Sequence, residues 1–220
     1  RDGDLDLFVI NHNIKNLRNF DASYVKKMVD PDAGDRLYEN QNNHFTDVTV
    51  KAGIISNPLG YGLGVSVADI NNDGWPDLYV TNDYVEEDYL YINNHDGTFK
   101  ESLRSAVGHI SNFSMGLDIA DINNDGLDDI FTLDMLPEDN KRQKLLYAPD
   151  NYELYNNTVN NGFYHQLMRN MLQLNNGDGT FSEIGQLAGV SNTDWSWSAL
   201  LADFNNDGQK DLFVTNGYGR

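Results

Sequence analysis

The sequence of 220 residues contains no cysteine. A chain without thiols has no disulfide framework, no cysteine nucleophile and no thiolate metal site. It also lacks any run of about 18 apolar residues, so it offers no candidate transmembrane helix, and its first residues lack the pattern of a signal peptide. The lack of a signal-peptide pattern carries no weight, because the chain starts inside a repeated motif and we expect it to be part of a longer protein.

Basic residues are scarce. Fifteen Lys and Arg stand against 34 Asp and Glu, which gives a formal net charge of −19. Such a chain has little to neutralise phosphates with, so a nucleic-acid partner and binding to an anionic membrane surface are both disfavoured. We therefore expect no nucleic acid and no direct membrane insertion.

Familiar catalytic motifs are missing as well. The histidines at positions 12, 44, 95, 109 and 165 show neither H-x-x-x-H nor H-E-x-x-H spacing. No nucleophile elbow and no phosphate-binding loop occurs. The signals for an enzyme are therefore weak.

What the sequence does contain is a nine-residue motif that occurs three times, as residues 69–77, 121–129 and 203–211. Oxygen-bearing side chains stand at positions one, three, five and nine, and a glycine at position six allows a sharp turn. Oxygens at this spacing converge on one hard cation, which predicts calcium. The expected ligands, including the backbone carbonyl of position seven, are Asp69, Asn71, Asp73, Trp75 and Asp77; Asp121, Asn123, Asp125, Leu127 and Asp129; and Asp203, Asn205, Asp207, Gln209 and Asp211. A fourth, partial site is expected at Asp2, Asp4 and Asp6.

The EF-hand is the first alternative, since its loop starts in the same way. An EF-hand loop must close with a glutamate at position twelve and lie between helices. Here position twelve is Val80, Thr132 or Val214, within β-branched and aromatic runs that are typical of strands. The motif therefore joins two strands. A turn that binds no metal is the second alternative, because Asn, Asp and Gly favour turns by themselves.

The motif recurs within a longer unit, and its shortest spacing, from Asp69 to Asp121, is 52 residues. Four short strands fit this unit. The first precedes the loop (63–68, 115–120 and 197–202), the second follows it, the third covers 89–92, 37–39 or 171–174, and the fourth begins at a hairpin phenylalanine (Phe45, Phe99 or Phe181). Four strands repeating at this interval predict the blades of a β-propeller. A β-sandwich is the alternative, because it also has many short strands.

These residues resemble the FG-GAP/VCBS repeats of integrin-α-type β-propellers, especially the bacterial and cartilage-acidic-protein-like members. The likeness rests on the loops, the Gly-rich strand at 61–65, and the hairpins Asn94–Phe99 and Asn176–Phe181. It implies an all-β propeller with four-stranded blades and calcium in its loops. Typical propellers have four to eight blades, so we expect about three blades here and the rest in the missing part of the protein.

The expected repeat units are 1–68, 69–120, 121–202 and the start of another at 203–220, with insertions at about 13–35 and 135–166. In an up-and-down sheet the calcium loops and the Asp-Gly-Thr hairpins lie at one end, and both insertions lie at the other. The second insertion predicts a short helix from Leu136 through Leu146 with Pro137 in its first turn. Its aromatic residues either pack onto the blade or form a binding platform.

Two further positions repeat on the insertion side. Polar residues follow the loops (Asn11, Asn82, Asp134 and Asn216), and aromatic residues precede them (Tyr61, Phe113 and Trp195). These residues either shape turns or hold a polar ligand. In the resembled propellers partners bind opposite the calcium loops. We therefore expect a calcium-stabilised module, outside the cell, in the periplasm or at the cell surface, that binds protein or glycan. The alternative is a calcium-dependent polysaccharide lyase or hydrolase.

Overall fold

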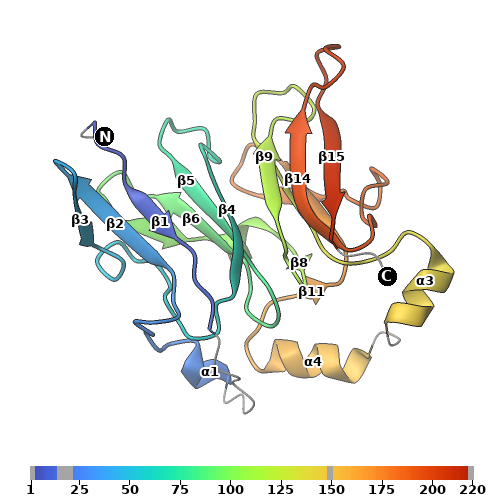
Figure 1. Ribbon diagram of the computed structural model, residues 1–220, viewed down its shortest axis with the longest axis horizontal. Coiled ribbons are helices and arrows are strands. Elements are labelled where there is room, and N and C mark those ends of the chain that lie inside the picture. Colours follow the sequence, from blue (N-terminus) through green and yellow to red (C-terminus); the bar gives the residue numbers. More distant parts are fainter. Residues whose placement is uncertain (1–2, 14–21, 148–150, 218–220) are drawn as a thin grey trace.

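The computed structural model describes residues 3–13, 22–147 and 151–217, apart from the side chains of residues 22 and 23, and is dominated by antiparallel sheets (Figure 1). The first sheet has three strands, β1 (Leu7–Val9), β2 (Arg36–Gln41) and β3 (His44–Asp47). The second has four, β4 (Gly62–Ala68), β5 (Asp77–Asn82), β6 (Tyr89–Asn93) and β7 (Phe99–Glu101). The third has β9 (Leu117–Ala120), β10 (Asp129–Thr132), β12 (Met171–Asn175) and β13 (Phe181–Glu183). The last pair is β14 (Ser196–Ala202) with β15 (Asp211–Asn216).

Each sheet follows the strand order predicted from the repeat. Neighbours in the second sheet run β4-β5-β6-β7, and those in the third run β9-β10-β12-β13. The predicted strands are confirmed with small shifts at their ends, since the first strand of the third sheet begins at Leu117 instead of Met115. The described residues therefore form a row of successive sheets, not the two facing layers of a β-sandwich.

Strands adjoining the loops alternate their side chains between two hydrophobic clusters. In β5, Leu78 and Val80 pack toward the first sheet, in a cluster with Tyr91, whereas Tyr79 packs toward the third sheet. In β10, Ile130 joins Tyr79, and Phe131 packs toward β14 and β15. Because successive residues of a strand point to opposite faces, one short strand can contribute to two clusters. Each sheet is thus buried against the next.

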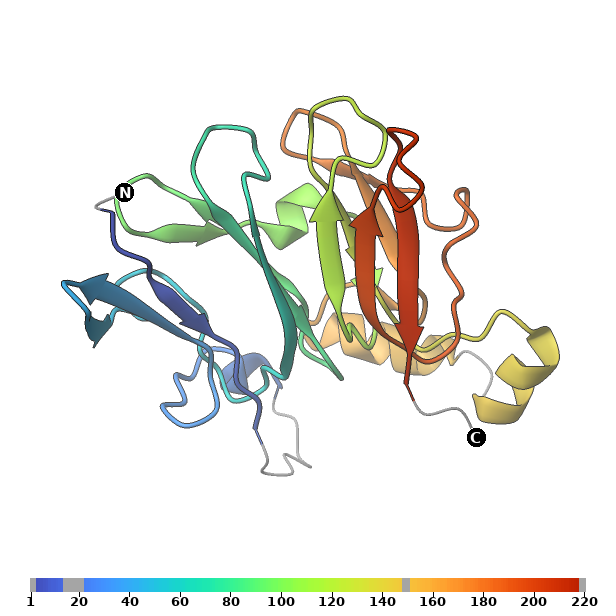
Figure 2. The same cartoon turned by 45° about the horizontal axis from the view of Figure 1, so that its top comes forward.

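The first strands of successive units, β4, β9 and β14, lie side by side in sequence order (Figure 2). A Cβ atom on Gly64 would stand 2.7 Å from the Leu117 side chain, and one on Gly116 would stand 2.3 Å from the Trp197 carbonyl oxygen. Both distances are too short for a side chain. Glycine at these positions therefore permits close approach of the backbones.

Four short helices occur in the described residues, α1 (Ala22–Val25), α2 (Leu103–Ala106), α3 (Asn140–Leu146) and α4 (Tyr152–Asn160). The predicted start of the helix at Leu136 is wrong. The carboxylate of Asp139 accepts the backbone N–H of Arg142 and caps α3, so Pro137 precedes the helix. Helix α4 was not predicted. Neither was the parallel pair β8 (Ile110–Ser111) and β11 (Gln166–Leu167), which joins the second insertion to the entry of the third sheet.

The two ends of the sheets carry different structures. Figure 2 shows the nine-residue loops at the top of the sheets and helices α1, α3 and α4 along the bottom. The predicted separation of the loops from the insertions is therefore confirmed. We call the end with the helices the insertion face.

Candidate metal loops and the insertion face

The three nine-residue loops share one hydrogen-bond pattern. In the first, the two carboxylate oxygens of Asp69 accept the backbone N–H groups of Asp73 (2.8 Å) and Gly74 (2.7 Å). The same bonds join Asp121 to residues 125 and 126, and Asp203 to residues 207 and 208. The position-five carboxylate accepts the N–H of position seven in every copy. The sequence of the motif therefore determines the same turn in all three copies.

Left-handed residues make this turn possible. The asparagine at position four has a positive φ in each copy, 57° in Asn72, 60° in Asn124 and 65° in Asn206. The glycine at position six has φ of 86° or more, a conformation that costs glycine little. Asparagine tolerates the left-handed region better than most residues. The Asn-Asp-Gly run is therefore required by the backbone as well as by the side-chain oxygens.

The aspartate at position nine fastens the loop to the sheet. In Asp77, Oδ2 accepts the N–H of Ile70 and Oδ1 accepts the N–H of Asn93 in β6. Asp129 makes the corresponding bonds to Ile122 and Asn175. Both residues are fully buried, and burial is the main cause that raises the pKa of each carboxyl. These two aspartates link three consecutive strands at one corner.

The partial fourth copy keeps this register. Asp6 accepts the N–H of Asn40 at 2.9 Å, as Asp77 accepts that of Asn93. Asp4 accepts the N–H of Asn42 at 2.8 Å. The expected ligand Asp2 lies outside the described residues.

The donor chemistry of the loops fits a calcium ion, because positions one, three, five and nine of each complete copy offer three carboxylates and one amide oxygen. As the side chains stand in the described part of the chain, no three His, Asp or Glu groups converge in a form that could hold a metal ion. Their oxygens accept N–H groups, and in two copies the position-three amide donates to the position-five carboxylate. Calcium therefore stays a prediction based on the type and spacing of the donors.

The hairpin beside the first loop touches it directly. The ring of His95 stacks on Trp75 with centroids 4.9 Å apart, and its Nε2 lies 2.9 Å from an oxygen of Asp73. His95 adopts φ of 67°, and Gly177 occupies the same place in the next hairpin with φ of 75°. The loops and the Asp-Gly-Thr hairpins thus share one end of the molecule, as the repeat predicts.

On the insertion face, the repeated polar residues are largely engaged by the chain itself. Asn82 is buried, and its Oδ1 accepts the N–H of Tyr61 at 2.8 Å. Asp134 is also buried, and its Oδ2 accepts the N–H of Phe113 and the hydroxyl of Ser111. Burial raises the pKa of Asp134 to about 6 despite these bonds.

The outer two members of that polar set are also hydrogen-bonded within the chain. Asn11 donates its amide N–H to the carbonyl of Gly34, and Asn216 accepts a hydrogen bond from the hydroxyl of Ser196. The aromatic member Trp195 keeps 39% of its surface exposed. In this part of the structure the polar residues shape the turns, and the Trp195 side chain stays partly accessible.

A groove of about 590 Å³ opens on the insertion face beside α3. Its lining is polar and comprises Glu138, Asp139, Arg142, Asn192, Thr193, Asp194 and Asn216. Arg142 pairs with Asp194, at 2.7 Å between Nε and Oδ2. Asp194 has φ of 66° although it is not glycine. The groove brings the second insertion together with the repeated position Asn216.

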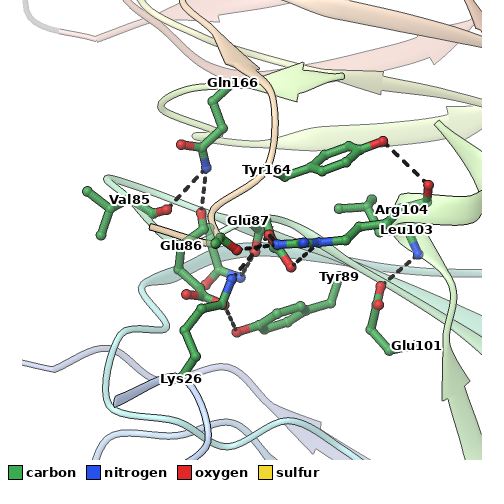
Figure 3. A network of polar contacts seen from close by, with 12 residues as sticks. Lys26, Val85, Glu86, Glu87, Tyr89, Glu101, Leu103, Arg104, Tyr164 and Gln166 are labelled. Carbon is green, nitrogen blue, oxygen red and sulfur yellow. Dashed lines mark hydrogen bonds and ion pairs between the residues drawn. The ribbon is translucent and has the colours of Figure 1, made fainter. Parts of the chain in front are cut away.

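A buried ionic network joins the two insertions to the second sheet (Figure 3). Lys26 lies 3.5 Å from Glu86 and 3.2 Å from Glu87, and Arg104 binds Glu87 through two nitrogens. Both glutamates are buried. Burial raises the pKa of Glu86, and the nearby Lys26 opposes that shift.

The second insertion reaches the same network from the other side. The amide of Gln166 donates to the carbonyl of Glu86 at 3.1 Å, and Arg104 donates to the carbonyl of Gly162 at 2.7 Å. The insertions are thus fastened to the sheet.

One repeated feature was not predicted from the sequence. Two residues after the hairpin phenylalanine stand Asp47, Glu101 and Glu183, and each caps the turn that follows the fourth strand. Glu101 accepts the N–H of Leu103 at 2.7 Å, and Glu183 accepts that of Gly185. The signal was the acidic residue at one fixed distance from each phenylalanine. His109 and Arg169 also contact Glu183, and its pKa is lowered to about 2 by its hydrogen bonds and by Arg169, which outweigh burial.

Comparison with known proteins supports the repeat directly. The sequence profile of the FG-GAP-like repeat matches residues 1–80, 69–132 and 150–214, and each match contains at least one copy of the loop. No curated protein sequence matches significantly. None of the helices in the described ranges is long and apolar enough to span a membrane. Since the profile covers most of the sequence, the chain belongs to the FG-GAP-like repeat family.

Proposed function

We propose that this chain is a section of a calcium-stabilised β-propeller that binds a protein or glycan partner through its insertion face. The observation that carries the proposal is the separation of the two ends of the sheets. Tight, repeated loops occupy one end, and the insertions occupy the other (Figure 2). Long insertions on a rigid scaffold are where recognition usually lies. FG-GAP repeats are also typical of extracellular or surface proteins, which suits such a role.

Side-by-side packing of the first strands supports the propeller. Strands β4, β9 and β14 are adjacent, and each unit continues outward through its later strands. Such a meander, repeated around an axis, generates blades. In the β14–β15 pair, Leu200 and Phe213 are about half exposed. In the preceding sheets, the corresponding faces are buried against a neighbouring sheet. The repeat units 1–68, 69–120, 121–202 and 203–220 then contribute to successive blades.

Calcium would be held by the side chains of loop positions one, three, five and nine and by the carbonyl of position seven. In the first loop these residues are Asp69, Asn71, Asp73, Asp77 and Trp75. A bound ion supplies positive charge to carboxylates that otherwise repel one another. The chain itself keeps those carboxylates together, because the position-nine aspartate is fixed by two backbone N–H groups. The role proposed for the ion is structural.

Exposed apolar residues on the insertions support a binding role for that face. Leu145 on α3 and Tyr152 on α4 keep 75% and 76% of their surfaces exposed. Large apolar side chains exposed on an insertion are available for contact with a partner. The neighbouring polar groove supplies groups that would fix the orientation of a partner.

A binding screen with matched variants tests the proposal. The full-length protein is screened against immobilised glycans and purified surface proteins, and saturable binding without turnover is expected. The double change Leu145→Glu and Tyr152→Glu should weaken that binding at least tenfold. Leu5→Glu changes an equally exposed apolar residue at the opposite end and should leave it unchanged. Equal weakening by both variants, or turnover of a bound glycan, would contradict the proposal.

A further inference from the structure

Three aromatic rings meet on the insertion face where the first and second sheets adjoin. The imidazole of His12 stacks on Tyr61, with centroids 4.4 Å apart and planes inclined by 28°. Tyr84 meets Tyr61 edge to face, at 5.0 Å and 84°. His12 and Tyr84 are exposed. We call His12, Tyr61 and Tyr84 the aromatic corner.

Tyr84 has a backbone conformation that tyrosine rarely adopts. Its φ is 66°, in the left-handed region that bulky residues rarely adopt. The surrounding turn is fastened by the chain, since the N–H of Asp83 donates to the Tyr61 carbonyl at 3.0 Å and the N–H of Tyr84 donates to the Asp83 carboxylate at 2.8 Å. Glycine or asparagine would suit this backbone better. Strain of this kind concentrates at sites of ligand contact.

The fold gains little from the Tyr84 ring, because 54% of the residue remains exposed. In the free protein, Tyr84 therefore carries both backbone strain and an aromatic ring exposed to water. We propose that the aromatic corner binds the apolar face of a neutral sugar ring within a glycan, with Tyr84 as the outer stacking surface. This inference rests on the proposed function and narrows its ligand to one class.

The geometry disfavours the other ligands of aromatic sites. A cage for an ammonium group needs rings set apart so that the cation fits between them. Here the rings already touch one another, so only outer faces are free. A polyproline helix likewise needs grooves between aromatic side chains. A flat sugar ring needs one accessible aromatic face, which Tyr84 offers.

Charge further restricts the sugar. The carboxylate of Asp83 lies directly beside Tyr84, and Asp35 holds the N–H of Asn11, the residue before His12. The whole chain carries a formal charge of −19. Uronate or sulfated sugars would be repelled by this negative charge, whereas neutral sugars would not. The aromatic corner is therefore suited to neutral glycans.

The test uses calorimetric titration of the full-length protein with cellohexaose, mannohexaose, maltohexaose and chitohexaose. Hexagalacturonate and decaproline serve as the anionic and polyproline probes. We expect at least one neutral hexasaccharide to bind and both other probes to fail. Tyr84→Gly should weaken the binding at least tenfold, whereas Phe45→Ala, which removes a half-exposed aromatic ring from β3 at the other end of the sheets, should change it less than twofold.

Thermal unfolding of the same variants separates a binding role from a structural one. Tyr84→Gly should unfold at the same or a higher temperature, because relief of the left-handed strain offsets the greater freedom of glycine in the unfolded chain. A lower unfolding temperature, no neutral hexasaccharide bound, preferred binding of either other probe, or unchanged binding by Tyr84→Gly would each overturn the inference. If the Leu145 and Tyr152 double variant still loses a partner while Tyr84→Gly does not, the proposed function stands and only the inference fails.

Discussion

At the residue scale, buried aspartates hold the ends of strands in place through hydrogen bonds. Asp88 is fully buried and accepts the N–H of Asn82 and the hydroxyls of Tyr79 and Ser114. Burial raises its pKa to about 7, and the charge of Asp134 contributes in the same direction. In the unfolded chain the same carboxyl titrates near its ordinary value of 3.8. Between these values the folded protein binds more protons than the unfolded chain.

The free energy of unfolding should therefore fall as the pH rises from about 4 to about 7. Asp88→Asn should flatten that dependence, because the amide stays neutral and its oxygen can still accept the Asn82 N–H. Denaturant midpoints measured at about pH 5 and about pH 8, with chelator present, check this prediction. Glu153→Gln, an exposed change on α4, is the control and should keep the parental slope. The same slope in Asp88→Asn would contradict the prediction.

Some of these residue roles follow from sequence and others do not. The loop residues such as Asp73 are identifiable because three copies hold them at one spacing. The position of Asp88 is Asp35 in the first sheet and Asn170 in the third, and each accepts the backbone N–H of a repeated polar residue. The sequence does not mark this role, because the residue type changes and the hydroxyl partner Ser114 is known only from the three-dimensional contacts. Asn82 and Asp134 recur in sequence, but whether a side chain faces a ligand or closes a turn is decided by three-dimensional contacts.

At the element scale, substitutions can test the close packing of the first strands. Gly116→Ala would place a methyl group 2.3 Å from the Trp197 carbonyl oxygen and separate β9 from β14. Overpacking of this kind should lower the free energy of unfolding by about 3 kcal/mol. Gly108→Ala, where a Cβ meets nothing within 4 Å, should change it little. Urea denaturation of both variants measures the difference, and equal midpoints would be inconsistent with close packing of the first strands.

The insertions depend on buried charge. Lys26 of the first insertion pairs with Glu86 and Glu87, so Lys26→Ala leaves these buried carboxylates with less compensation. Breaking such a contact should cost about 3 kcal/mol. Lys27→Ala removes the same charge one residue later, at an exposed position, and should stay within about 0.5 kcal/mol of the parent. Chemical denaturation distinguishes the two, and a stable Lys26→Ala variant would show that the first insertion is not fastened by this pair.

Regular elements were easier to predict than the insertions for a physical reason. Strands β4, β5 and β6 repeat with their hydrophobic alternation, so one unit informs the others. Helix α4 has no buried side chain and no counterpart in the other units, so neither core packing nor repetition marks it. The start of α3 was misplaced because Pro137 suits a first helical turn, whereas the Asp139 cap decides where the helix begins.

At the scale of the whole molecule, charge and architecture are coupled. The acidic loops gather at one end of every sheet, and the position-nine aspartates lie at the corner shared by three strands. The repulsion within this end of the molecule opposes folding. Divalent ions at the loops would remove much of it, and they would act on all sheets at once because the sheets pack in a row.

Calcium should therefore raise the thermal unfolding temperature of the entire cooperative unit. With a dissociation constant on the order of 10⁻⁴ M, about 5 mM calcium would stabilise the fold by about 2 kcal/mol for each occupied loop. Asp73→Ala should lose the contribution of one loop in calcium and differ less from the parent in chelator. Glu153→Ala also removes one carboxylate, but outside the loops, and should keep the full response. Calorimetric scans with calcium, magnesium or chelator measure these effects. If parent and Asp73→Ala respond equally to calcium, the first loop does not stabilise the fold through a bound ion.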